Sequence, residues 1–100
     1  MSSPDILDIL AALADRTRLG AMHIIWAGGE HCVCELMARL DASQSRMSRH
    51  MKTLKLAGLI TDRRDAQWVR YRKNENLPPE IVAAVDAILV ADRIDERHVA

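Results

Sequence analysis

Cysteine is scarce in this chain, which contains only Cys32 and Cys34, separated by one residue. A bond between two cysteines this close cannot cross-link distant parts of the chain, which argues against the disulfide framework of a small secreted domain. We therefore expect both residues to be thiols in a reducing, cytosolic compartment.

Long apolar runs are also missing. The first ten residues, MSSPDILDIL, lack the basic head and apolar core of a signal peptide, and no segment approaches a membrane span. Repeats, low-complexity tracts and interdomain linkers are absent as well. We expect a single domain over residues 1–100, located in the cytoplasm, without a membrane partner.

Motifs of the common enzyme classes are not found. The chain has no phosphate-cradling glycine loop, no metalloprotease helix motif and no Ser/His/Asp arrangement that can be placed. We therefore expect no catalytic residue, no catalytic cofactor and no enzyme activity.

Net charge is zero, but the charges are unevenly distributed. Residues 43–73 hold nine Lys/Arg and two acids, which leaves five basic and twelve acidic residues elsewhere, from totals of 14 each. A basic segment on an acidic body creates a local field that attracts a polyanion. This pattern favours nucleic acid as the partner of residues 43–73.

The centre of this basic segment is the stretch SQSRMSRHMKTLKLAG, from Ser43 to Gly58. Ser43 is a typical helix N-cap and Gly58 a typical stop, and three apolar residues recur between them at helical spacing: Met47, Met51 and Leu54. The other face carries hydroxyls and cations without a carboxylate, namely Ser45, Ser48, Arg49 and Lys52. Such a face suits the major groove of DNA, although an ordinary solvated helix is the alternative.

The remaining pattern predicts a winged helix-turn-helix. Apolar positions at helical spacing predict a first helix with Ile6, Leu10 and Leu13 on one face, a second with Leu19, Met22 and Trp26, and a third with Val33, Leu36, Met37 and Leu40. Leu59–Thr61 and Trp68–Arg72 are strand-like, with a hairpin turn near residues 65–67. Pro78-Pro79 opens a last helix with Ile81, Val85, Ile88 and Leu89 on its apolar stripe.

We therefore predict a mainly α fold, an α+β winged helix-turn-helix with four helices, a two-stranded β wing and a C-terminal helix. Residues 32–57 form the helix-turn-helix and residues 59–73 the wing. The terminal helices, residues 1–13 and 79–97, have little domain left to pack on, so we expect them to form a homodimer interface.

The chain resembles the ArsR/SmtB family of metal-responsive winged-helix repressors. Residues 14–19 are similar to that family's ALADPTRL segment, with Arg16 in place of a common proline, and residues 43–50 are similar to its SQxxxSRH recognition motif. Gly58-Leu59-Ile60 followed by Trp68-Val69-x-Tyr71-Arg72 matches its wing. Residues 32–36, CVCEL, resemble the ELCVCDL box of arsenical-resistance repressors, which implies trivalent arsenic or antimony as the inducer.

The two cysteines can act together on a soft, thiophilic ion. A helix N-terminus favours the thiolate, which is the form that binds. Residues two apart on a regular helix point to nearly opposite sides, so we expect chelation to distort the first turn. Because that helix packs on the DNA reader, the distortion would lower affinity for the operator. Cadmium, lead or zinc as inducer, and thiol oxidation, remain the alternatives.

A third ligand is not evident. The arsenical-repressor box continues to a third cysteine where this chain has Met37, which we assign to the core. His31 and Glu30 are neighbouring donors, but we place both on a solvated loop. The family also has a zinc site on its last helix, but this chain lacks the paired histidines of that site. We therefore interpret the acidic and histidine side chains at that helix end as solvated, namely Asp92, Asp95, Glu96 and His98. His23, in an apolar helix, is a structural histidine.

The DNA-binding residues divide by chemistry. Gln44, Ser45, Ser48 and Arg49 are the candidates for base and near-base contacts, since Gln and Arg pair bidentately with base edges. His50 flanks the buried stripe, so we weigh packing or a phosphate contact at least equally with base reading. Phosphate contacts position a protein on DNA but do not read its sequence. We assign such contacts to Lys52, Arg63, Arg64, Arg70 and Arg72. Trp68 and Tyr71 are expected to pack within the hairpin.

Overall fold

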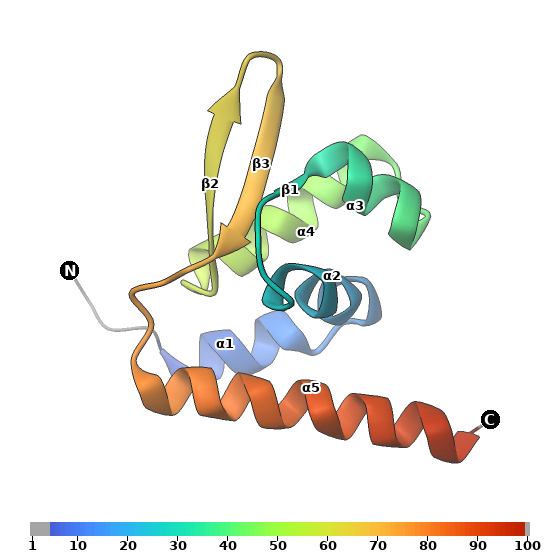
Figure 1. Cartoon of the computed structure of the whole chain (residues 1–100), viewed down its shortest axis with the longest axis vertical. Coiled ribbons are helices and arrows are strands. Elements are labelled where there is room, and N and C mark those ends of the chain that lie inside the picture. The colour runs from blue at the N-terminus through green and yellow to red at the C-terminus, as the bar shows by residue number, and fades with distance from the viewer. Residues whose placement is uncertain (1–4, 100) are drawn as a thin grey trace.

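Five helices and a small antiparallel sheet make up the described part of the chain (Figure 1). The computed structural model describes the backbone of residues 5–99 and the side chains of residues 5–93. No helix in this described part has the length and apolar content needed to cross a bilayer. The elements are α1 (Ile6–Leu13), α2 (Arg16–Trp26), β1 (His31–Cys32), α3 (Val33–Leu40), α4 (Gln44–Leu56), β2 (Ile60–Asp65), β3 (Trp68–Lys73) and α5 (Pro79–Val99).

The bounds of α4 follow from its end residues. The Ser43 hydroxyl accepts a hydrogen bond from the Arg46 amide at 3.3 Å, which satisfies one of the free N–H groups at the helix start. Gly58 follows the helix with φ of +86°, a conformation that suits glycine. The preceding turn is made by Asp41, whose left-handed backbone (φ 52°) ends α3. α3 and α4 therefore meet at a sharp corner, as a helix-turn-helix requires.

The core joins the helices and the sheet in one cluster. Leu36 of α3 and the three predicted apolar residues of α4, Met47, Met51 and Leu54, are fully buried. Tyr71 of β3 is also buried, as expected for hairpin packing, whereas Trp68 is 40% exposed at the far end of β3. α4 is thus fixed by its inner stripe, which leaves its other face free.

The sheet has three strands in the order β1-β3-β2, one more than the sequence predicts. β2 and β3 form the expected hairpin, which projects away from the helices (Figure 1). The extra strand, β1, pairs antiparallel with β3, so that Cys32 lies opposite Arg70 and His31 opposite Tyr71. β1 has only two residues, which is too short for an alternating apolar pattern, so the sequence does not predict this strand.

Helix α1 buries only part of the predicted face, since Leu13 is buried while Ile6 and Leu10 are not. Ile9, Ala12 and Leu13 enter the core, while Ile6 and Leu10 remain 47% and 46% exposed. A short helix with apolar residues on two sides has one side to pack inward and another left in solvent.

The end of α5 corrects the prediction of a solvated surface for Asp92, which is only 9% exposed. Its carboxylate accepts hydrogen bonds from Arg16 Nη1 at 3.0 and 3.1 Å and contacts His23 Nε2 at 2.8 Å. Arg16 stands at the first position of α2, where the related family commonly has proline. Asp92 therefore ties α5 to α2, and His23 has the structural role predicted for it. The side chains of Asp95, Glu96 and His98 lie outside the described residues.

We expect the Asp92 contacts to make stability depend on pH at the acidic end. The hydrogen bond from His23 lowers the pKa of Asp92; burial opposes this shift, and Arg16 adds to it. A carboxyl group with a lowered pKa contributes stability above its unfolded pKa of about 3.9, and this contribution is lost as pH falls through the folded value. We expect the free energy of unfolding, measured with urea across pH 2–6, to fall less toward acidic pH in Asp92→Asn than in the wild type. Equal losses would contradict this assignment.

Candidate nucleic-acid interface and thiol site

The outward face of α4 is open and basic. Gln44, Ser45, Ser48, Arg49 and Lys52 are all exposed. Within the described part of the chain, neither Arg49 nor Lys52 has a carboxylate within ion-pair distance, whereas Lys55 at the helix end pairs with Asp62 at 3.0 Å. The residues predicted to read bases therefore share one accessible surface, and its cations are not neutralised from inside the molecule.

The wing cations fall into two groups. Arg63 donates two hydrogen bonds of 2.7 Å to Glu30, and Arg70 Nε lies 2.9 Å from Asp65 Oδ2. The Arg63 contact lowers the pKa of Glu30, and Glu30 raises that of Arg63. By contrast, Arg64 and Arg72 are exposed and no described carboxylate pairs with them. Solvent screens exposed ion pairs, which therefore contribute little stability, so DNA phosphates can compete for Arg63 and Arg70 at little cost.

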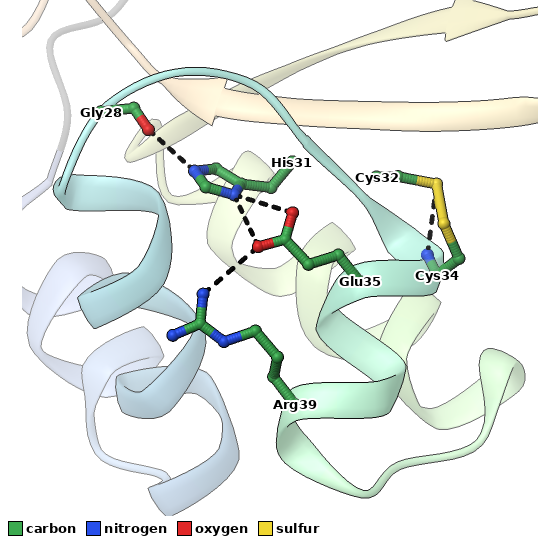
Figure 2. Close-up of polar contacts among 6 residues, drawn as sticks. All are labelled: Gly28, His31, Cys32, Cys34, Glu35 and Arg39. Atoms are coloured by element: carbon green, nitrogen blue, oxygen red, sulfur yellow. Dashed lines mark hydrogen bonds and ion pairs between the residues drawn. A yellow bond between two sulfur atoms is a disulfide. The ribbon is translucent and has the colours of Figure 1, made fainter.

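Cys32 and Cys34 lie at the junction of β1 and α3, and their sulfur atoms are joined in a disulfide (Figure 2). Cys32 has an extended backbone (φ −67°, ψ 146°) and is the N-cap of α3, so it stands outside the helix. Its sulfur accepts a hydrogen bond from the Cys34 amide at 3.3 Å. The two Cα atoms are 5.2 Å apart.

This geometry removes the premise on which we expected ion chelation to distort the first helical turn. The expectation assumed that both cysteines are helical, with side chains on opposite sides. Because α3 begins at Val33, one side chain comes from an extended residue and the other from the helix. The two sulfurs thus converge on an intact helix N-terminus.

The neighbouring donors are more engaged than a solvated loop implies. His31 lies in β1, with Nε2 2.8 Å from the Gly28 carbonyl oxygen and Nδ1 3.1 Å from both Glu35 carboxylate oxygens (Figure 2). Burial raises the pKa of Glu35, but the contacts with His31 and Arg39 outweigh it and the net shift is downward. Glu30 is held by Arg63. Both predicted alternatives for a third ligand therefore already have partners.

Other donor sets give no third ligand either. Met37 is half-buried and packs against the core, in agreement with its predicted role. Among the described residues, no group of three or more His, Cys, Asp or Glu side chains is placed to hold a metal ion. The disulfide differs from the two free thiols that the sequence predicts. Once it is reduced, the protein offers a soft ion the pair of sulfur atoms, one buried and one exposed.

Comparison with known proteins places this arrangement in a family. The sequence model described as "Bacterial regulatory protein, arsR family" matches residues 15–62. The arsenic resistance transcriptional regulator ArsR2 of Pseudomonas putida is 42% identical over 85 residues, which is 85% of this chain and 74% of that protein. The chain belongs to the arsR family of bacterial regulatory proteins.

Further relatives agree with this assignment. The arsenical resistance operon repressor of Escherichia coli is 39% identical over 80% of this chain and 68% of its own length. The structure of HlyU from Vibrio cholerae is 31% identical, with a TM-score of 0.71 over 83% of this chain and 86% of that one. The predicted winged helix-turn-helix fold is confirmed. Since the family consists of transcriptional regulators, the prediction that this arsR-family protein is not an enzyme is confirmed too.

Two features of the site could not be found from sequence patterns. One is the pairing of Cys32 with Arg70, which links the thiols to the wing. The other is the position of Arg18, whose Nη1 lies 3.1 Å from Nδ1 of His50 in the reading helix. Residue 18 lies within the family-like ALADPTRL segment, but a motif does not show which distant side chain it meets.

Proposed function

We propose that this arsR-family regulator is a homodimeric repressor that leaves its operator when trivalent arsenic or antimony binds Cys32 and Cys34. The observation that carries the proposal is the convergence of the two sulfur atoms at the start of α3, directly before the reading helix. The relatives named for arsenical resistance support the choice of inducer. Since DNA binding is its activity, we place the protein in the cytoplasm.

Operator recognition is assigned to the open face of α4 and to the wing. Gln44, Ser45, Ser48 and Arg49 are proposed to read bases, because amide and guanidinium groups pair with base edges in the major groove. Lys52 and the wing arginines are proposed to hold phosphates (Arg63, Arg64, Arg70 and Arg72). Of these, Arg64 and Arg72 are ready to bind, while Arg63 and Arg70 must first exchange a carboxylate for a phosphate.

Dimerisation is assigned to the terminal helices, residues 1–13 and 79–97. The support is the exposure of large apolar side chains on α1 and α5: Ile6 at 47%, Leu7 at 69%, Leu10 at 46% and Val90 at 52%. Large apolar side chains gathered on the surface mark an interface more often than a free surface. A two-fold dimer would present two copies of α4 to paired half-sites.

The chain supplies two thiolates to the inducer. Once a cellular thiol has reduced the disulfide to two thiols, both sulfurs can reach one soft ion without breaking α3, and the helix N-terminus favours their thiolate forms. With His31, Glu35 and Glu30 engaged and residue 37 a methionine, a third thiolate would come from a small cellular thiol. Cadmium, lead and zinc are the alternative ions of the same site.

The position of Cys32 suggests how ion binding is transmitted. Cys32 is both the cap of α3 and the residue paired with Arg70 of the wing, so a shift of its backbone acts on two DNA-binding elements. α3 in turn packs on α4. Weakening of operator binding by 100-fold requires about 2.7 kcal/mol of coupling, which is within the usual range for allostery.

A second candidate function is redox sensing through the same thiols. It is favoured by one observation, the disulfide between Cys32 and Cys34. Oxidation would then replace ion binding as the event that changes the cap of α3.

Gel shifts with the DNA upstream of the protein's own gene test the proposal. The reduced protein should retard this DNA, and arsenite should abolish the shift while a strong reductant is present. Release that requires an oxidant and is insensitive to arsenite under reducing conditions would favour the redox candidate. Release by neither agent would contradict both.

A further inference from the structure

We propose that a hollow between α2 and α4, lined by Arg18, Arg46, Arg49, His50 and Thr53, seats one phosphate of the DNA backbone. The inference rests on the proposed operator binding and adds Arg18, Arg46 and Thr53 to the interface. The hollow has a volume of about 350 Å³, and its lining contains three arginines and no carboxylate. It adjoins the reading face because Arg49 borders both surfaces.

Two backbone carbonyl groups of α1 hold the Arg18 guanidinium in place. Its Nε donates to the Ala12 carbonyl oxygen at 2.6 Å and its Nη2 to that of Ala11 at 3.4 Å. These carbonyls stand at the C-terminal end of α1, where the helix dipole favours a cation. Because both bonds fix the guanidinium, Arg18 offers a preorganised positive charge beside α4, which costs less to bind with than a mobile one.

Contact with Arg18 also sets the role of His50. A guanidinium carries only donors, so Nδ1 of His50, 3.1 Å from Arg18 Nη1, must be the acceptor. The ring proton then lies on Nε2, which makes no hydrogen bond to another described residue. His50 thereby presents an N–H group, and a phosphate oxygen is a suitable acceptor for it.

The charge around the hollow is favourable for an anion. Arg46 is exposed, and no carboxylate of the described chain lies within ion-pair distance of it or of Arg49. Asp15 is an acid beside these residues: it lies 3.9 Å from His50 Nδ1 and accepts a hydrogen bond from the Arg18 amide at 2.9 Å. Asp15 caps α2 behind His50 and does not line the hollow. The cations that face the hollow therefore remain available to a phosphate.

The salt dependence of DNA binding tests this seat. Each phosphate contact contributes a slope of about −0.9 to log K against log salt. We expect Arg46→Gln, an exposed substitution, to reduce the magnitude of the slope by about 0.9 on both the operator and an unrelated duplex. The control Arg39→Gln, an exposed arginine on α3 that pairs with Glu35 and has no assigned DNA contact, should keep the wild-type slope. An unchanged slope in Arg46→Gln, or a loss confined to the operator, would overturn the seat.

A second readout reports on His50 in the folded wild-type protein. Nitrogen-15 spectra of the imidazole should show Nδ1 unprotonated, and the Nε2 signal should shift when duplex DNA is added. A protonated Nδ1 would overturn the inferred geometry. So would a signal that responds to inorganic phosphate, at constant ionic strength, but not to DNA.

The failure of the seat and the failure of the proposed function are distinguishable. If the wild-type protein binds no duplex in a salt-dependent manner, the DNA-binding proposal itself fails. If it binds, and Arg46→Gln leaves the slope intact, only the seat is wrong.

Discussion

Replacing Cys34 with serine should weaken arsenite binding by at least about 100-fold, corresponding to about 2.7 kcal/mol. A hydroxyl is a poor ligand for a soft ion, and the remaining sulfur of Cys32 cannot chelate alone. Cys34 is exposed and lies at the start of α3, so the fold should tolerate the change. Arsenite titration of the reduced variant, followed by calorimetry or ultraviolet absorption, measures the loss.

The structure supplies a matched pair for this test. Cys32→Ser also removes one sulfur, but serine is itself a favoured N-cap and its hydroxyl can accept the Cys34 amide in place of the sulfur. Both variants should bind operator DNA with wild-type affinity and should fail to release it with arsenite. Met37→Leu, a change in the core side chain one turn beyond Cys34, should release normally. Full inducibility of both serine variants would place the inducer site elsewhere.

Truncation of Arg49 to alanine should cost about 1–3 kcal/mol of operator binding, or roughly 5- to 150-fold in affinity. The reason is that Arg49 is exposed on the reading face and has no ion pair within the described chain. If it reads a base, the loss falls on the operator and the preference over unrelated DNA becomes smaller. Binding isotherms with operator and with a scrambled duplex, at one salt concentration, give both quantities.

Lys52→Ala is the comparison for that experiment. Lys52 shares the exposed face of α4 but is assigned to a phosphate, so its loss should lower affinity for both duplexes equally. A uniform loss in Arg49→Ala as well would contradict base reading and would assign Arg49 to the phosphate seat alone.

Much of this structure follows from local sequence signals. Ser43 and Gly58 bound the reading helix because a cap and a left-handed stop act on their immediate neighbours. The stripe of Met47, Met51 and Leu54 predicts the buried face because a 3.6-residue period is a local property. The position of the wing follows in the same way from a change of period after Gly58.

What the sequence could not give depends on contacts between distant residues. The strand β1 exists because His31 and Cys32 meet β3, and no property of two residues predicts that partner. The burial of Asp92 depends on Arg16 and His23 of α2, about seventy positions earlier in the chain. The geometry of the thiol pair turned on a single boundary, since a helix that begins at Val33 leaves Cys32 extended.

The central claim is that one ion bound by Cys32 and Cys34 controls operator binding. Titration of the reduced protein with arsenite, in the presence of labelled operator, measures ion binding and DNA release in the same sample. We expect one arsenic per thiol pair, with DNA release that follows occupancy and is absent in Cys34→Ser. Saturation of the thiols while the operator stays bound would contradict the claim.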